Sequence, residues 1–117
     1  MSMNNATIKS LESIIRSELR SLGYIKIDFN NESEKGFSVI ADGFLRDIFL
    51  GVLVRLAPAC IEEITSEEIH LIKNNASAAK KEPWAAIMSI NEQGELVDGI
   101  EWKNLSKPIR LNRISIT

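Results

Sequence analysis

The sequence predicts an α/β (α+β) domain, a single mixed β-sheet of four to five strands flanked by two helices, in the order helix, three strands, helix, two strands. Two segments, one near the N-terminus and one after residue 65, repeat apolar residues at three- and four-residue steps, which is the helical period. The segments between and after them are apolar runs bounded by turn residues. Because the second helix lies between two apolar strands, we expect those strands to be parallel neighbours.

Length and composition fit one domain. The chain has 117 residues, of which 44% are apolar and 26% charged. We expect the domain to span residues 1–107, with 108–117 forming a basic C-terminal tail or an edge strand. No run of eighteen apolar residues and no secretion-signal pattern occurs, so the expected location is cytoplasmic. Cys60 and His70 are the only residues of their types, which excludes an internal disulfide and a zinc site of cysteines and histidines.

The first helix is expected over residues 8–22 and ends at Gly23, which can adopt a left-handed conformation. Its apolar stripe consists of Ile8, Leu11, Ile15, Leu19 and Leu22. Residues 24–29 then alternate with period two and predict a strand, and the polar residues 30–36 predict an exposed loop.

The next strand is expected over residues 37–41, with a hairpin turn at Asp42 and Gly43, which both tolerate positive φ. Residues 44–56 fit either a helical stripe or a strand. Gly51 inside the segment, Pro58 after it and the nearly continuous apolar run favour a strand buried on both faces.

The second helix is expected to begin at Thr65. Thr65 and Glu68 have the spacing of a capping box, in which each side chain bonds the backbone amide of the other. Residues 80–83 end the helix, and apolar strands are expected over residues 84–90 and 95–102.

Charge is unevenly distributed along the chain. The net charge is -2, residues 24–100 are acidic, and residues 101–117 carry four basic groups and one acidic group. Proteins that bind duplex DNA usually present a basic face across the main body. The candidate nucleic-acid or partner contacts in this chain are confined to its C-terminal end: Lys103, Lys107, Arg110 and Arg113.

The order of elements and several phrases resemble the restriction-endonuclease-like PD-(D/E)XK superfamily, especially its Holliday-junction-resolvase-like members. The phrases are residues 19–24 (LRSLGY), 36–43 (GFSVIADG), 49–55 (FLGVLVR) and 83–88 (PWAAIM). In that family, two strand carboxylates hold Mg²⁺ and a lysine assists the attacking water. Residue by residue, the resemblance places the metal-binding Asp at Ser38, the Glu at Leu53 and the Lys at Arg55. It therefore implies a nuclease fold with a degenerate active site.

Displaced carboxylates offer an alternative nuclease site. Asp42 follows Ser38 by four residues, Asp47 begins the third strand, and Glu12 lies on the first helix, where some relatives of that family carry an extra acid. The simpler interpretation is that Asp42 serves a turn and that Asp47 and Glu12 are solvated.

Three functions follow from these observations. The first is a non-catalytic domain that binds a protein partner or a nucleic acid, with no cofactor and with self-association as a homodimer. The second is a Mg²⁺-dependent nuclease that uses the displaced carboxylates. The third is a small acidic α+β binding protein of the secretion-chaperone or immunity-protein type. The acidic body favours a protein partner.

Overall fold

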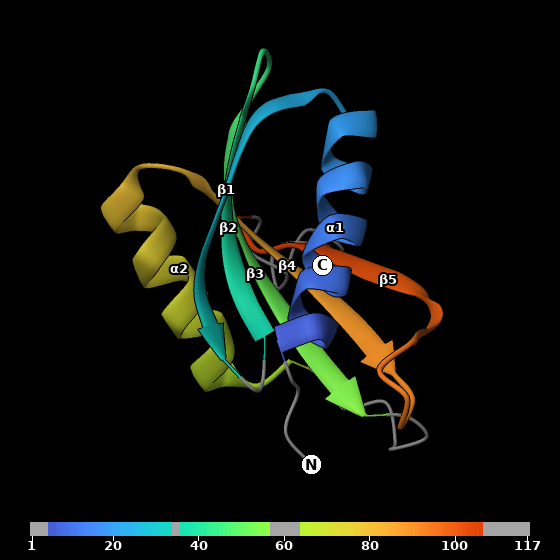
Figure 1. Cartoon of the computed structure of the whole chain (residues 1–117). Coiled ribbons are helices and arrows are strands. Elements are labelled where there is room, and N and C mark those ends of the chain that lie inside the picture. The colour runs from blue at the N-terminus through green and yellow to red at the C-terminus, as the bar shows by residue number, and fades with distance from the viewer. Residues whose placement is uncertain (1–4, 34–35, 57–63, 107–117) are drawn as a thin grey trace, which may run out of the picture.

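The computed structural model describes residues 5–33, 36–56 and 64–106 of the chain (Figure 1). Within them the elements follow the expected order of helix, three strands, helix, two strands. Their bounds are α1 Asn5–Ser21, β1 Tyr24–Ser33, β2 Gly36–Gly43, β3 Asp47–Leu56, α2 Ser66–Ala79, β4 Glu82–Ile90 and β5 Leu96–Asn104.

The five strands form one mixed sheet in the spatial order β1-β2-β3-β4-β5. The pairs β1–β2, β2–β3 and β4–β5 are antiparallel, and β3–β4 is parallel, as a crossover through α2 requires. The α+β class and the parallel pair are thus confirmed, and of the segment 44–56 residues 47–56 form the expected strand.

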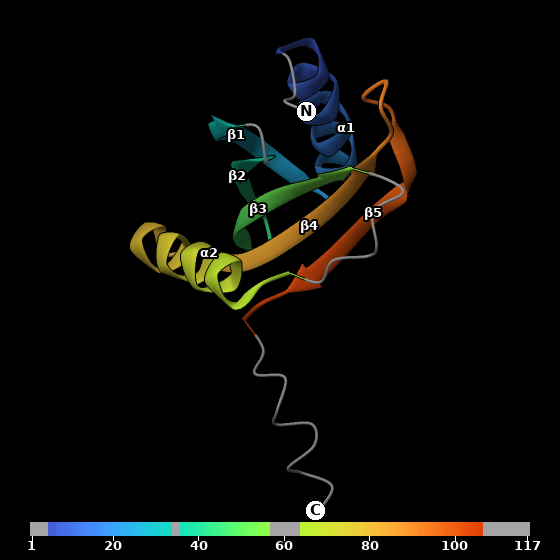
Figure 2. The same cartoon turned by 90° about the horizontal axis from the view of Figure 1, so that it is seen from below.

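The two helices cover opposite faces of the sheet (Figure 2). On one face, Leu11, Ile15 and Leu19 of α1 are fully buried in a core that includes Val39 and Leu50. On the other face, Ile72 and Ala76 of α2 pack in a smaller cluster with Phe49, Ala85 and Leu105. Side chains alternate between the faces along each strand, so β3 supplies both cores.

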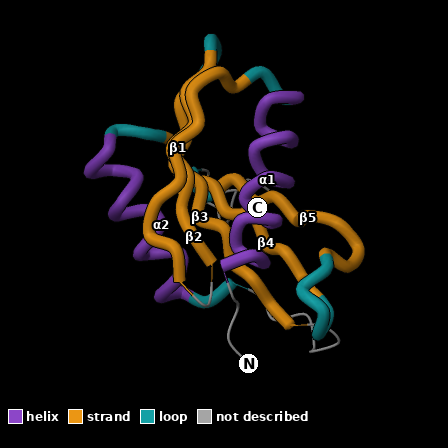
Figure 3. The backbone as a smooth tube through the Cα atoms, viewed as in Figure 1, coloured by secondary structure: helices purple, strands orange, loops and turns teal. Residues whose placement is uncertain are grey.

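The sequence predicted two features at the wrong residues: the end of the first strand and the turn between the second and third strands. β1 continues to Ser33, into the segment expected to be an exposed loop. The β2–β3 turn lies at residues 44–46, because Asp42 remains in β2 and pairs across the hairpin with Asp47. The Gly43 amide donates to the Arg46 carbonyl at 3.1 Å and closes this turn, which lies at the loop-coloured end of the hairpin in Figure 3.

The capping box of α2 is confirmed. The Glu68 amide donates to Thr65 Oγ1 at 3.1 Å, and the Thr65 amide donates to Glu68 Oε1 at 2.9 Å.

Neither described helix is both long enough and apolar enough to cross a membrane. The tail or edge strand expected at residues 108–117 lies outside the described residues.

Candidate functional site

The three positions singled out by the resemblance lie on the face of the sheet that α2 covers. Ser38 belongs to β2, and Leu53 and Arg55 belong to β3. Ser38 is buried, and its hydroxyl donates to the Asn30 carbonyl of β1 at 3.3 Å. These three positions therefore lie on one side of the sheet.

Ser38 and Leu53 line a hollow of about 340 Å³ between this sheet face and α2, which we call the α2 groove. Its lining is predominantly apolar. The sheet contributes Gly36, Phe37, Ser38, Phe49, Gly51, Val52 and Leu53, and α2 contributes Glu68, Leu71, Ile72 and Asn75.

The groove exists because small residues meet opposite the helix. Ser38 and Gly51 are cross-strand partners in the β2–β3 register. A Cβ at Gly51 would lie 2.5 Å from Ile72 Cδ1, so only glycine allows α2 to approach this closely. The helix packs mainly on β3 and β4, and the groove opens on the β2 side of α2.

Leu71 forms an accessible part of the groove wall. Its side chain is 62% exposed although it is a large apolar residue on a helix that packs against the sheet. The neighbouring Ile72 is buried and fixes the helix on the sheet. The wall thus presents an apolar surface to solvent on a firmly held element.

The charged side chains at the groove, Arg55 and Glu68, form an ion pair with each other. Arg55 Nη2 donates to Glu68 Oε1 at 2.9 Å, and both side chains are largely buried. Burial alone would raise the pKa of Glu68, but the hydrogen bonds from the Thr65 amide and from Arg55 outweigh it and hold the pKa below its usual value of 4.5. Arg55 thereby ties β3 to the N-terminus of α2.

We expect Glu68→Gln to lower the free energy of unfolding by about 1 kcal/mol at pH 7, because glutamine keeps the capping oxygen but loses the charge that pairs with Arg55 and with the helix N-terminus. Because the folded-state pKa is depressed, the carboxylate contributes stability above the unfolded pKa and loses it as the pH falls through the folded pKa. The difference between wild type and variant should therefore shrink below about pH 4.5. Urea unfolding at several pH values measures it, with Glu67→Gln as the control, which loses only an exposed charge near the helix N-terminus and should show a smaller loss.

The side chains that the resemblance places at metal-binding positions do not fit Mg²⁺. Magnesium prefers carboxylate and water oxygens in octahedral geometry. Ser38 bonds a backbone carbonyl, Leu53 offers no donor atom, and Arg55 brings a positive charge. Within the described residues, no three side chains of His, Cys, Asp or Glu are grouped so that they could hold a metal.

The displaced carboxylates are only partly brought together. Asp42 and Asp47 are cross-strand partners, and Lys81 Nζ lies 2.7 Å from Asp42 Oδ1 and 3.8 Å from Asp47 Oδ2. The hydrogen bond to Asp42 raises the pKa of Lys81, so the ammonium stays charged between the two acids. The expectation that Glu12 is solvated is wrong, because Glu12 is buried on α1, which covers the opposite face of the sheet.

The basic residues of the C-terminal end are described only in part. Lys103 Nζ lies 3.2 Å from Glu101 Oε2, so its charge is paired within β5. Lys107, Arg110 and Arg113 lie outside the described residues.

Sequence reasoning missed the groove and its wall residue Leu71. A signal was available, because Leu71 falls beside the apolar stripe of the second helix, where a solvated face would carry a polar residue. The hollow itself depends on which small residues face α2, and that requires the register of β2 against β3.

Comparison with known proteins leaves the groove to be interpreted from its own chemistry. No protein-family model matches the sequence, and no curated protein matches it either.

Proposed function

We propose that this protein is a non-catalytic binding domain and that the α2 groove receives an apolar segment of a partner protein. One observation carries the proposal: where the resembled nucleases bind their metal, this chain has a groove with apolar walls. Ser38 and Leu53 line it, and Arg55 beside it is already paired with Glu68. Concave, mostly apolar sites with a few polar groups are typical of ligand binding.

The chemistry of the groove favours a protein segment over a nucleic acid. Nucleic-acid affinity derives largely from unpaired lysines and arginines that neutralise phosphates. Among the described residues that line the groove, Glu68 is the one that carries a charge, and the nearby Arg55 is paired with it. An apolar side chain from a partner, in contrast, would cover Leu53 and Leu71 and remove their surface from water.

Binding to random short peptides tests the proposal directly. Phage-displayed peptides selected on the wild-type protein should be rich in apolar residues and should lose affinity for Leu71→Glu by about 30-fold or more, as at an interface hot spot. Phe44→Glu is the matched control, because it places the same charge on another exposed apolar residue, outside the groove lining. Selection of no peptide, or peptides that bind Leu71→Glu as well as wild type, would contradict the proposal.

The nuclease alternative makes a different prediction. If Asp42 and Asp47 held Mg²⁺, the metal would have to displace the Lys81 ammonium from between them. We expect no cleavage of a branched DNA in Mg²⁺ or Mn²⁺. Cleavage that disappears in Asp42→Ala would replace the binding proposal with the nuclease.

Two further expectations belong to this proposal. We infer a cytoplasmic location, where the single cysteine, Cys60, would remain a thiol. We also infer that the protein self-associates as a homodimer, which is common among small soluble proteins.

A further inference from the structure

Large apolar side chains are exposed together at one end of the molecule, where the β2–β3 hairpin projects beside the α1–β1 turn (Figures 1 and 3). Phe44 and Leu45, at the hairpin turn, are 89% and 97% exposed. Leu22 and Ile25, on either side of the α1–β1 turn, are 63% and 58% exposed. We call these four residues the tip patch.

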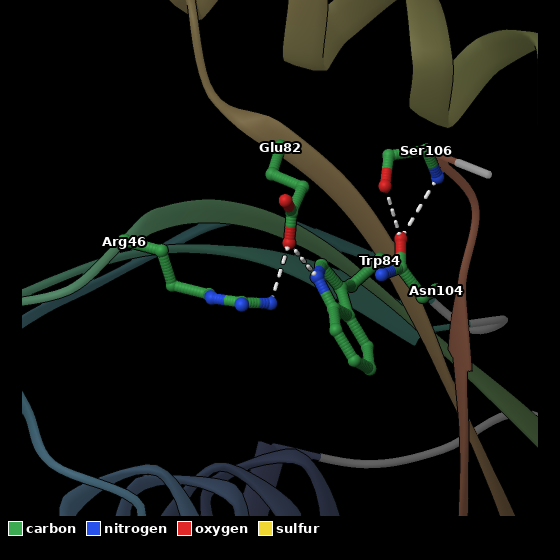
Figure 4. Close-up of polar contacts among 5 residues, drawn as sticks. All are labelled: Arg46, Glu82, Trp84, Asn104 and Ser106. Carbon is green, nitrogen blue, oxygen red and sulfur yellow. Dashed lines mark hydrogen bonds and ion pairs between the residues drawn. The ribbon is translucent and has the colours of Figure 1, made fainter.

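The hairpin that carries the patch is fixed by polar contacts with the start of β4. Arg46 Nη1 donates to Glu82 Oε1 at 3.1 Å, and Trp84 Nε1 donates to the same oxygen at 2.6 Å (Figure 4). Lys81 holds the base of the hairpin through Asp42. Phe44 and Leu45 are thus displayed on a braced turn, which reduces the entropy that binding would cost.

A hollow lies beside these protruding side chains. It has a volume of about 240 Å³ and is lined by Leu22, Gly23, Tyr24, Gly43, Phe44, Leu45 and Arg46. Leu22, Phe44 and Leu45 line the hollow themselves, so these three protruding residues and the hollow belong to the same surface. A two-fold axis through such a surface would place the Phe44–Leu45 turn of each copy against the hollow of the other.

The exposed apolar area is of the size that a dimer needs. With roughly 200 Å² for each fully exposed side chain of this size, the four exposed fractions amount to about 600 Å² per chain. Standard interfaces bury about 800 Å² per partner, rim included. The patch would supply most of that area.

The charges around the patch also suit a second copy. Identical surfaces carry charge of the same sign, so a strongly charged rim would repel its own copy. Here Arg46 is paired with Glu82, and Lys81 is paired with Asp42 and Asp47. The rim is therefore close to neutral.

We propose that the tip patch is the interface of a two-fold symmetric homodimer in which the Phe44–Leu45 turn of each copy packs on the hollow of its partner. This assigns the expected self-association to a surface separate from the α2 groove. Dimerisation and peptide binding can therefore fail independently.

Sedimentation-velocity analysis over a range of protein concentrations tests the interface. The full-length wild type should dimerise, and Phe44→Glu and Leu45→Glu should each weaken the dimer by about 30-fold or more. Leu71→Glu is the matched control and should leave the dimer intact while removing peptide binding. Circular dichroism should show unchanged folding for all three variants, because each replaced side chain is exposed.

Two results would overturn the inference. One is a wild type that remains monomeric at every concentration. If such a monomer binds vesicles of anionic phospholipid, and Phe44→Glu reduces that binding, the patch contacts a membrane surface instead. The other is a dimer that persists in both Phe44→Glu and Leu45→Glu.

Discussion

Gly36→Ala is expected to lower the free energy of unfolding by about 3 kcal/mol. Gly36 begins β2 with φ +148°, where side chains are strained. An added Cβ would also lie 1.9 Å from the Val52 carbonyl oxygen, a backbone atom of the neighbouring strand. The methyl group can be accommodated only if β2 and β3 separate locally. Urea denaturation followed by circular dichroism measures the loss.

Gly99→Ala is the matched control for this prediction. Gly99 has φ +121°, but no atom of the described residues lies within 4 Å of the position that its Cβ would take. Its substitution should therefore cost only the conformational strain, about 1 to 2 kcal/mol. Equal losses at Gly36 and Gly99 would show that the contact with Val52 contributes nothing.

Gly51→Val should be about as damaging as Gly36→Ala, with a loss of about 3 kcal/mol in the free energy of unfolding. Gly51 lies beneath α2, and its Cβ would lie 2.5 Å and 2.6 Å from Ile72 Cδ1 and Cγ1. Since Ile72 is buried, its side chain has little room to turn away from the added methyl groups. We expect α2 to be displaced from the sheet, with loss of the α2 groove.

A double-mutant cycle with Ile72→Ala tests this explanation. Ile72→Ala alone removes buried methyl groups and should cost about 3 kcal/mol. In the double variant, the new valine occupies part of the space that Ile72 leaves, so the combined loss should be clearly smaller than the sum. Additive losses would mean that Gly51 and Ile72 do not compete for the same space.

The order of the elements was predictable from the sequence because local signals were strong. The stripe of Leu11, Ile15 and Leu19 set the first helix, and the capping box of Thr65 and Glu68 set the start of the second. Strand was also the correct interpretation for residues 47–56 of the segment 44–56, because a strand with one core on each face has a continuous apolar sequence.

The turn positions were less predictable, because they depend on contacts between distant residues. Asp42 and Gly43 carry a strong turn signal, yet Asp42 stays in the strand, where Lys81 binds it from the start of β4. Phe44 and Leu45 carry no turn signal and occupy the turn. Pairing across the sheet overrode local preference here.

The sequence predicted where the candidate site lies in the fold but not which side chains contact one another there. The resemblance gathered Ser38, Leu53 and Arg55 on one side of the sheet, and they do lie on one face. The rotation of α2 about its axis on the sheet determines two further features of the site. It brings Glu68 to Arg55, and it leaves Leu71 as an exposed part of the groove wall. Periodicity fixes the buried stripe of a helix but not its neighbours across a groove.

The parallel seam between β3 and β4 has a consequence for biosynthesis. During synthesis β3 leaves the ribosome before α2 and β4, and its parallel partner becomes available only when Glu82, which pairs with Ile48, has also emerged. Until then one edge of the apolar strand Asp47–Leu56 is an open template for neighbouring nascent chains. A delay between the emergence of β3 and that of β4 should therefore increase the share of newly made chain that aggregates.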